Sequence, residues 1–322
     1  MTNLRAAVGQ RVLCPATDCV DICNAPLDGH VKMPRLGFGT YMVSHAHGEA
    51  RACHLARPCV PPPPRAYHTG PRQISARDAE AAVLTALREG YRHIDTAQLH
   101  RNEAAVGRAV RASGLARESV FVTTKLWNAD NGYDATLQAF HRSLSELGLD
   151  YVDLYVLHSP MRVDARLDSW RAMEDLLRGG RVRAIGVSNF GQHQLEELFE
   201  HCTVRPAVNQ LELHPFGTRR ALVDFCVQHG MALQAYSPLT KGTRLRDPTL
   251  VEMAARYQKS TAQLMVRWCL QKGFTVLPRS VNPAHIAANT QVYDFNISDI
   301  DMAKLDSLNE DYVTGWDPTR GP

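Results

Sequence analysis

The sequence predicts an α/β fold, namely a (β/α)8 TIM barrel. Short apolar stretches alternate with amphipathic ones, and from residue 35 onward they form eight strand–helix units. The predicted strands are almost wholly apolar, as expected for a parallel sheet that is buried on both faces. An open sheet that binds a dinucleotide carries GxGxxG after its first strand, and LGFGTY at 36–41 is not that motif. A closed barrel therefore fits better than an open, doubly wound sheet.

The elements follow one another in a regular order. Residues 26–39, PLDGHVKMPRLGFG, predict a small N-terminal hairpin that turns at Asp28 and Gly29, and then the first strand. Residues 74–90 have apolar positions at helical spacing and end in glycine, so they predict the first helix. Further strands are predicted at 91–95, 120–127, 152–159, 182–188, 207–213, 231–237 and 274–280. Further helices are predicted at 102–114, 133–148, 168–180, 192–202, 220–230, in two stretches across 248–272, and near 283–290.

Two segments interrupt this order. Residues 1–26 contain three cysteines and no clear period, so we expect an irregular N-terminal segment before a barrel that spans 27–322. Residues 43–73 contain four consecutive prolines and predict an irregular, polyproline-II-like or mobile insertion between the first strand and the first helix. Paired metal-ligand spacing is lacking there, so we predict no metal site from the insertion's His45, His47, Cys53, His54 and Cys59.

Composition narrows the function classes. The chain has 322 residues, 44% of them hydrophobic, and a net charge of +3 without a long basic block, so we expect no nucleic-acid partner. The N-terminal residues lack a secretory apolar region, and no run is long enough to cross a membrane. The eight cysteines form no regular framework. We therefore expect a reduced, soluble, cytoplasmic monomer without a membrane partner.

Polar residues follow the predicted strands at the points where they end. Each alone has a structural explanation: Asp95 could cap a helix, Lys125 could be a surface lysine, and His158 a hydrogen-bonded core histidine. Because the carboxyl ends of the strands form one end of a barrel, their convergence instead predicts an active site. The other polar residues at this end are Ser188, Asn189, Gln210, Tyr236, Ser237, Arg279 and Ser280.

This combination of side chains suits proton transfer beside a bound anion. Asp95 would hold the Lys125 ammonium, and that cation would lower the pKa of a neighbouring acid. His158 could donate a hydrogen bond to a substrate oxygen on which charge develops. Tyr236 presents a flat ring for an aromatic ligand, and Arg279, at the start of RSVNPAHIAAN, precedes a helix N-terminus that suits an anion.

These residues lie in motifs that closely resemble the aldo-keto reductase family. The motifs are GFGTY, GYRHIDTA followed by NEAAVG, TTKLWNADNGYDATLQAF, LGLDYVDLYVLHSPM, GVSNF, NQLELHP, AYSPL and LPRSVNPAHIAAN. They occur in the family's order and cover the chain from Leu27 to about Trp316, except for the insertion. LWNADNGYDATLQAF and the tail LNEDYVTGWDP look most like the prostaglandin F synthase and 2,5-diketogluconate reductase branch.

The resemblance implies an NADPH-dependent enzyme that reduces aldehydes or ketones to alcohols by hydride transfer. Asp95, Lys125 and His158 match three of the family's four catalytic positions. Ser188, Asn189 and Gln210 match residues that hold the nicotinamide amide, and Tyr236 matches the residue that stacks on its ring. The cofactor set is completed by Gly39, Thr40, Tyr41, Asp95, Ser237 and Leu239, and at the adenosine end by Arg279, Ser280, His285 and Asn289. Trp127 and Ser159 are assigned to the substrate pocket.

The chain departs from the family at four places. The catalytic tyrosine, the general acid for carbonyl reduction, is replaced by His100. A tryptophan that often follows the catalytic histidine is Ser159, which should widen the substrate pocket. At the adenosine end, His285 replaces a basic residue and Ala288 an acidic or amide one, so we expect NADPH to be preferred over NADH by a reduced margin. The fourth departure is the insertion.

Three readings follow from these departures. In the first, His100 replaces the tyrosine imperfectly, and Lys125 keeps the pKa of its imidazole below the free value of ~6.5. The chain would then be an impaired reductase, although His100 could equally be a polar loop residue while His158 and water supply the proton. In the second, the barrel binds nucleotide without catalysis, as a sensor or partner subunit. A metal-dependent hydrolase, the third, would need more ligands than Asp95 and His158.

Overall fold

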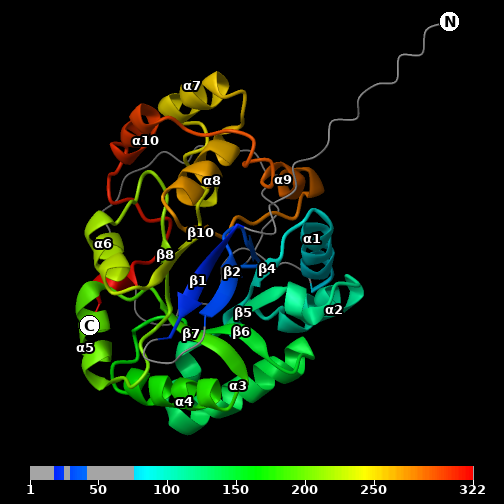
Figure 1. Cartoon of the computed structure of the whole chain (residues 1–322), viewed down its shortest axis with the longest axis vertical. Helices are drawn as coiled ribbons and strands as arrows, with labels where there is room; N and C mark the ends of the chain where they lie inside the picture. The colour runs from blue at the N-terminus through cyan, green and yellow to red at the C-terminus, as the bar shows by residue number, and fades with distance from the viewer. Residues whose placement is uncertain (1–17, 25–29, 42–75, 322) are drawn as a thin grey trace, which may run out of the picture.

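A computed structural model describes residues 18–24, 30–41 and 76–321 of the chain (Figure 1). Most of the N-terminal segment 1–26, the predicted turn at Asp28 and Gly29, and the insertion at 43–73 with its histidines and cysteines lie outside the described residues.

Eight parallel strands form the barrel, in the order of the sequence. They are β3 (Phe38–Gly39), β4 (His93–Asp95), β5 (Phe121–Leu126), β6 (Val152–Leu157), β7 (Val182–Ser188), β8 (Val208–Glu212), β9 (Ala232–Tyr236) and β10 (Thr275–Val276). A parallel bridge between Leu36 and Val276 joins the first and last strands, and the amide of Gly37 donates to the carbonyl of Val276 at 2.9 Å. The ring of strands is thereby closed, and the predicted (β/α)8 fold is confirmed.

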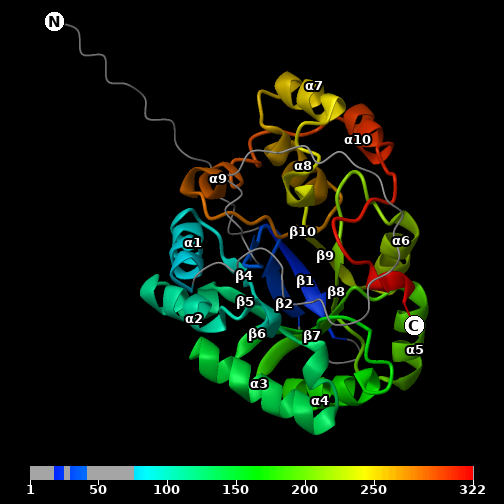
Figure 2. The same ribbon diagram turned by 180° about the vertical axis from the view of Figure 1, so that it is seen from behind.

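Helices surround the strands on the outside (Figures 1 and 2). They are α1 (Ala76–Arg88), α2 (Glu103–Ala112), α3 (Tyr133–Leu147), α4 (Arg166–Arg178), α5 (Gln192–His201), α6 (Arg220–Gln228), α7 (Pro248–Arg256), α8 (Thr261–Gln271), α9 (Pro283–Ala288) and α10 (Asp299–Asp306). All but α10 lie where the sequence predicts helices. Gly148 ends α3 with φ 60, a left-handed conformation that glycine adopts without strain.

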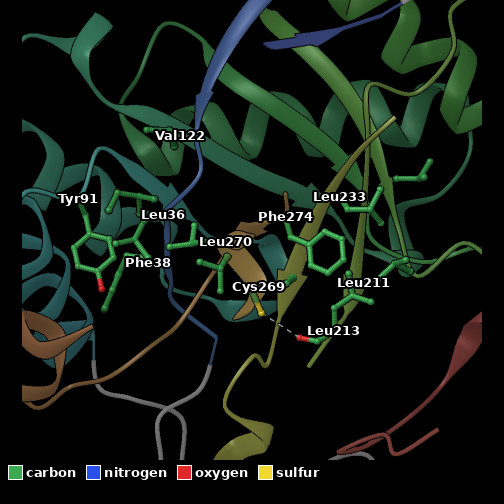
Figure 3. Packing of buried hydrophobic residues seen from close by; sticks show 14 of the residues in the cluster. Leu36, Phe38, Tyr91, Val122, Leu211, Leu213, Leu233, Cys269, Leu270 and Phe274 are labelled. Atoms are coloured by element: carbon green, nitrogen blue, oxygen red, sulfur yellow. Dashed lines mark hydrogen bonds between the residues drawn. The ribbon is translucent and has the colours of Figure 1, made fainter. Parts of the chain in front are cut away.

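The main core fills the space between the strands and the helices. Figure 3 shows Phe38, Tyr91, Leu233 and Phe274 among its buried side chains. The thiol of Cys269 in this core donates to the carbonyl of Leu213 at 3.9 Å. The apolar strand residues thus pack against the apolar faces of the surrounding helices.

A hairpin closes the amino-terminal end of the barrel. Its strands β1 (Cys19–Cys23) and β2 (His30–Pro34) pair antiparallel, and they lie in front of the barrel strands in Figure 1. Ile22 and Met33 are buried in a second apolar cluster with Phe121 at the start of β5. The sequence predicts a hairpin here, but β1 falls in the segment that was expected to be irregular, because CVDIC is too short to show a period. Its strand conformation comes from pairing with β2 and from burial of Ile22.

Candidate active site

The predicted catalytic residues lie together at the carboxyl-terminal end of the barrel. Asp95 is the last residue of β4 and lies beside Gly39 of β3. Lys125 is the fifth of six residues in β5, and His158 directly follows β6. Because the strands are parallel and in sequence order, residues about 30 positions apart along the chain become neighbours here.

A buried ion pair forms the centre of the site. Lys125 Nζ donates to Asp95 Oδ1 at 2.5 Å and to the carbonyl of Thr96 at 2.9 Å. Only 2% of Lys125 and 4% of Asp95 are exposed, and a buried ionised side chain is stable only when it is paired in this way. Burial lowers the pKa of Lys125, and the Asp95 carboxylate opposes that shift. The ammonium is thus held as a cation that is less strongly basic than a surface lysine.

His158 lies close to the ion pair, directly after β6. Its ring is edge-on to Trp127, with centroids 5.2 Å apart, and 6.2 Å from the ring of His100. Nδ1 of His158 is buried and has no hydrogen-bond partner among the described residues. Burial, followed by the charge of Lys125, lowers the pKa of His158 to about 3. The imidazole is therefore neutral at physiological pH, with one nitrogen that donates and one that accepts.

His100 ends a short 3-10 helix, Gln98–His100, next to the same site. It is 8% exposed, its ring lies 5.0 Å from that of Tyr41, and its Nδ1 lies 3.2 Å from Thr40 Oγ1. Burial is the largest cause of a pKa that lies well below 6.5, and the charge of Lys125 comes second, ahead of His158 and Arg279. The direction agrees with the sequence-based expectation, whereas the principal cause, burial, was not anticipated.

The residues matched to the nicotinamide amide form one hydrogen-bonded network. Asn189, at φ 63, donates from Nδ2 to the carbonyl of His158 at 3.1 Å and to Ser188 Oγ at 3.0 Å. The hydroxyl of Tyr236 donates to Asn189 Oδ1 at 2.8 Å, which fixes its ring. Gln210 Nε2 donates to Asp95 Oδ2 at 2.8 Å and to a second glutamine, Gln234, at 2.7 Å. Ser188 Oγ donates to the carbonyl of Gln210 at 2.9 Å, so the network reaches the Asp95 carboxylate through Gln210.

Arg279 and Ser280 follow β10 at the predicted adenosine end. The Arg279 guanidinium lies 5.7 Å from the centroid of the Tyr41 ring, and its Nη1 donates to the Tyr41 carbonyl. Ser280 Oγ accepts from the amide of Asn282 at 3.0 Å, just before α9. His285 is exposed and Asn289 is buried. Arg279 is the permanent cation that the structure places between β10 and the end of β3.

The two residues assigned to the substrate pocket have different environments. Trp127 is partly exposed beside His158. Ser159 is fully buried, and its hydroxyl donates to Asn128 Oδ1 at 2.9 Å. A widened pocket at Ser159 therefore remains a prediction, whereas Trp127 has accessible surface next to His158.

Two residues that were not predicted for the site, Thr96 and Asn102, link the segment after β4 to Thr40. Thr96 Oγ1 donates to Asn102 Oδ1 at 2.7 Å, and Asn102 Nδ2 donates to the carbonyl of Thr40 at 3.0 Å. Asn102 precedes α2 but its side chain makes no hydrogen bond to that helix. In the sequence, Asn102 indicates only the start of a helix, because no local pattern indicates a hydrogen-bond partner near residue 40.

Comparison with known proteins agrees with this architecture. The model of the Aldo/keto reductase family matches residues 66–310, and the chain belongs to that family. It is 48% identical over 240 residues to a 9,11-endoperoxide prostaglandin H2 reductase of Trypanosoma cruzi, covering 74% of this chain and 84% of that protein. It is 45% identical over 244 residues to a glyoxal reductase of Bacillus subtilis, covering 76% and 88% respectively. A Bombyx mori aldo-keto reductase solved in complex with NADP superposes with TM-score 0.78 at 31% identity, over 94% of this chain and 95% of that one.

Proposed function

We propose that this protein is an NADP(H)-dependent oxidoreductase that reduces small aldehydes or ketones to alcohols at the carboxyl-terminal end of its barrel. The observation that carries this proposal is the buried Asp95–Lys125 ion pair with the imidazoles of His100 and His158 beside it. Such a group can neutralise charge on a carbonyl oxygen and supply a hydrogen bond to it. The Bacillus subtilis glyoxal reductase and the Bombyx mori complex with NADP support the substrate class and the cofactor.

The residues present fit NADP(H). Tyr236 has a ring fixed through Asn189, which suits stacking on a flat heteroaromatic ring. The Arg279 guanidinium and the hydroxyl of Ser280 suit a phosphate, because a guanidinium donates two parallel hydrogen bonds to such a group. Gln210 uses its amide nitrogen on Asp95 and Gln234, so its oxygen is the atom left for a ligand. NADPH, when bound, supplies the hydride.

The chain's own residues would handle charge and protons. Lys125 lies where a cation disperses negative charge that develops on the substrate oxygen, and Asp95 keeps it charged. Neutral His158 can donate one hydrogen bond to that oxygen and hold the carbonyl in place. His100 occupies the position of the family's tyrosine, and its pKa well below 6.5 leaves it a poor acid at pH 7. We therefore infer slow reduction at neutral pH.

The branch of the family to which the chain belongs is also part of the proposal. The Trypanosoma cruzi prostaglandin H2 reductase and the LWNADNGYDATLQAF segment support the prostaglandin F synthase and 2,5-diketogluconate reductase branch. The residue at position 100 supports a second candidate, a barrel that binds the nucleotide with little or no turnover. The two candidates make the same prediction for binding and opposite predictions for catalysis.

One pair of measurements tests the proposal. NADPH oxidation is followed with 4-nitrobenzaldehyde, and NADPH binding is measured on the same protein by fluorescence titration. Binding with turnover supports the reductase. Saturable binding without turnover between pH 5.5 and 8 supports the sensor or partner barrel instead. Absence of NADPH binding contradicts both.

A further inference from the structure

A chain of three side chains leads from the start of α2 to His100. Asn102 Nδ2 donates to the carbonyl of Thr40 at 3.0 Å, and this fixes the orientation of the amide, since a carbonyl can only accept. Oδ1 of Asn102 therefore faces Thr40 Oγ1, at 3.5 Å, as an acceptor. The same Thr40 Oγ1 lies 3.2 Å from His100 Nδ1. All three side chains are at most 8% exposed, so water contributes little to these contacts.

The direction of each hydrogen bond follows from counting protons. The Thr40 hydroxyl carries one proton, which it can donate either to Asn102 Oδ1 or to His100 Nδ1. If it donates to His100, the contact with Asn102 joins two acceptors and no bond forms. If it donates to Asn102, a lone pair of Oγ1 faces His100, and Nδ1–H can donate to it. Both contacts are therefore hydrogen bonds only when the neutral imidazole carries its proton on Nδ1.

We propose that Thr40 and Asn102 are positioning residues that hold His100 in its Nδ1–H tautomer, so that Nε2 is an unprotonated base. No hydrogen bond from a described residue reaches Nε2. This inference rests on the proposed function, because it concerns the proton step at that site. In the family's arrangement a tyrosine hydroxyl donates at this position, whereas here the neutral side chain accepts.

An accepting nitrogen suits the oxidation of an alcohol better than the reduction of a carbonyl. The alcohol O–H bond breaks and its proton goes to Nε2, while the carbinol hydrogen leaves with its electron pair as hydride to NADP+. The products are the carbonyl compound, NADPH and the imidazolium of His100, which releases its proton to solvent. Neutral His100 in this tautomer therefore has the protonation state that alcohol oxidation requires, whereas carbonyl reduction requires its imidazolium.

Nitrogen NMR tests the tautomer without relying on turnover. In the full chain with 15N-labelled histidine, the His100 signals are those absent from His100→Gln. At pH 7.5 we expect a protonated Nδ1 and an unprotonated Nε2, favoured by about tenfold, which corresponds to one additional hydrogen bond. An Nε2–H signal in the parent protein would overturn the proposal, whatever its activity.

Matched variants test the two positioning residues. Asn102→Leu frees the Thr40 hydroxyl to donate to Nδ1, so the ratio of the Nδ1–H to the Nε2–H tautomer of His100 should fall about tenfold or more, and the Nε2–H form should dominate. Thr40→Val removes the hydroxyl and should also lose the preference for Nδ1–H, which covers the case in which Asn102→Leu does not fold. Thr96→Val is the control, because it removes a partner of Asn102 that does not contact His100. A tautomer unchanged in Asn102→Leu and in Thr40→Val would overturn the proposal.

The failure of this inference and that of the proposed function can be told apart. A parent that turns over NADPH with 4-nitrobenzaldehyde but shows Nε2–H keeps the function and loses the tautomer assignment. A parent that shows Nδ1–H but transfers hydride in neither direction keeps the assignment and loses both the base role of His100 and the proposed function.

Discussion

The two ends of the barrel use the same kinds of polar residue in different ways. His93, at the start of β4, lies 3.2 Å from the carbonyl of Pro34 through Nδ1 and 3.1 Å from Thr123 Oγ1 through Nε2. At the other end, His158 has a buried Nδ1 without a partner among the described residues, and His100 is held through Nδ1 alone. Both ring nitrogens of His93 are thus used within the fold, whereas His100 and His158 each have a ring nitrogen that no described residue bonds.

Two buried carboxylates, Asp153 and Asp95, also differ between the two ends of the barrel, in the kind of cation that each is paired with. Asp153, near the start of β6, is paired with Arg117 at 2.8 Å and with Arg183 at 2.7 Å, and both of these cations are permanent. Asp95 is paired with Lys125, whose pKa is lowered by burial. Both carboxylates are buried, so burial alone does not distinguish them. What distinguishes Asp95 is that its cationic partner, Lys125, has a lowered pKa, whereas the arginines beside Asp153 stay charged.

The largest effect is expected from Lys125→Met. Removing the ammonium should lower kcat by about 10²–10⁴-fold, because the developing oxyanion loses its cation. It also leaves Asp95 buried and unpaired, which costs about 3–5 kcal/mol of unfolding free energy. The double variant Asp95→Asn with Lys125→Met should recover much of that stability and none of the activity. Steady-state kinetics and urea unfolding measure the two effects.

The matched change at the amino-terminal end is Asp153→Asn. It should lower the unfolding free energy by a similar amount while kcat stays within about threefold of the parent value, since the hydrogen-bond partners of Asp153 among the described residues are Arg117, Val122 and Arg183. If Lys125→Met retained more than a tenth of the parent kcat, the proposed contrast between the two ends would be wrong.

The next effect concerns cofactor preference. Arg279→Gln should weaken NADPH binding by about 10–100-fold, the contribution of hydrogen bonds to a charged group, and leave NADH binding nearly unchanged. Arg183→Gln, at the opposite end of the barrel, should change the affinity for neither NADPH nor NADH. The two dissociation constants are measured by fluorescence titration at pH 7.5. Equal affinity of the parent protein for NADPH and NADH would remove Arg279 from the cofactor site.

The smallest effect is a pH dependence of stability that arises from His93. Burial lowers its pKa to about 4, against about 6.5 in the unfolded chain, so the unfolded state binds more protons between these values. The neutral form's contribution to stability is complete above pH 6.5 and is lost as the pH falls towards 4. Between pH 7.5 and 5 this amounts to about 2 kcal/mol.

His93→Gln tests that assignment, because an amide can keep one donor and one acceptor but does not titrate. The parent should lose more unfolding free energy than His93→Gln when urea titrations at pH 7.5 and 5 are compared. His100 and His158 shift in the same direction and remain in both proteins. An equal loss in the two proteins would show that His93 is not the group responsible.

The sequence predicted the barrel, and the residues that gather at its carboxyl-terminal end, better than it predicted the hydrogen bonds among those residues. Strand ends are local features, so Asp95, Lys125 and His158 could be assigned to one end from alternation alone. The bond from Gln210 to Asp95 joins residues 115 positions apart, and the contact of Thr40 with His100 spans 60. Neither contact leaves a pattern in the local sequence. The helix α10 was missed because its side chains show no clear amphipathic period, and Ser298 caps it by accepting from the amide of Asp301.

The central claim is that the carboxyl-terminal end is a reductase site whose proton supply is limited by His100. The pH profile of kcat for NADPH-dependent reduction by the parent and by His100→Tyr tests it most directly. Because the pKa of His100 is lowered, the parent should be slow at pH 7 and faster towards acidic pH as imidazolium forms. His100→Tyr should raise kcat at pH 7 by about 10²-fold, flatten this rise, and leave NADPH affinity nearly unchanged. A tyrosine variant as slow as the parent while still binding NADPH, or a parent already fast at pH 7–8 and unaffected by His100→Ala, would contradict the account.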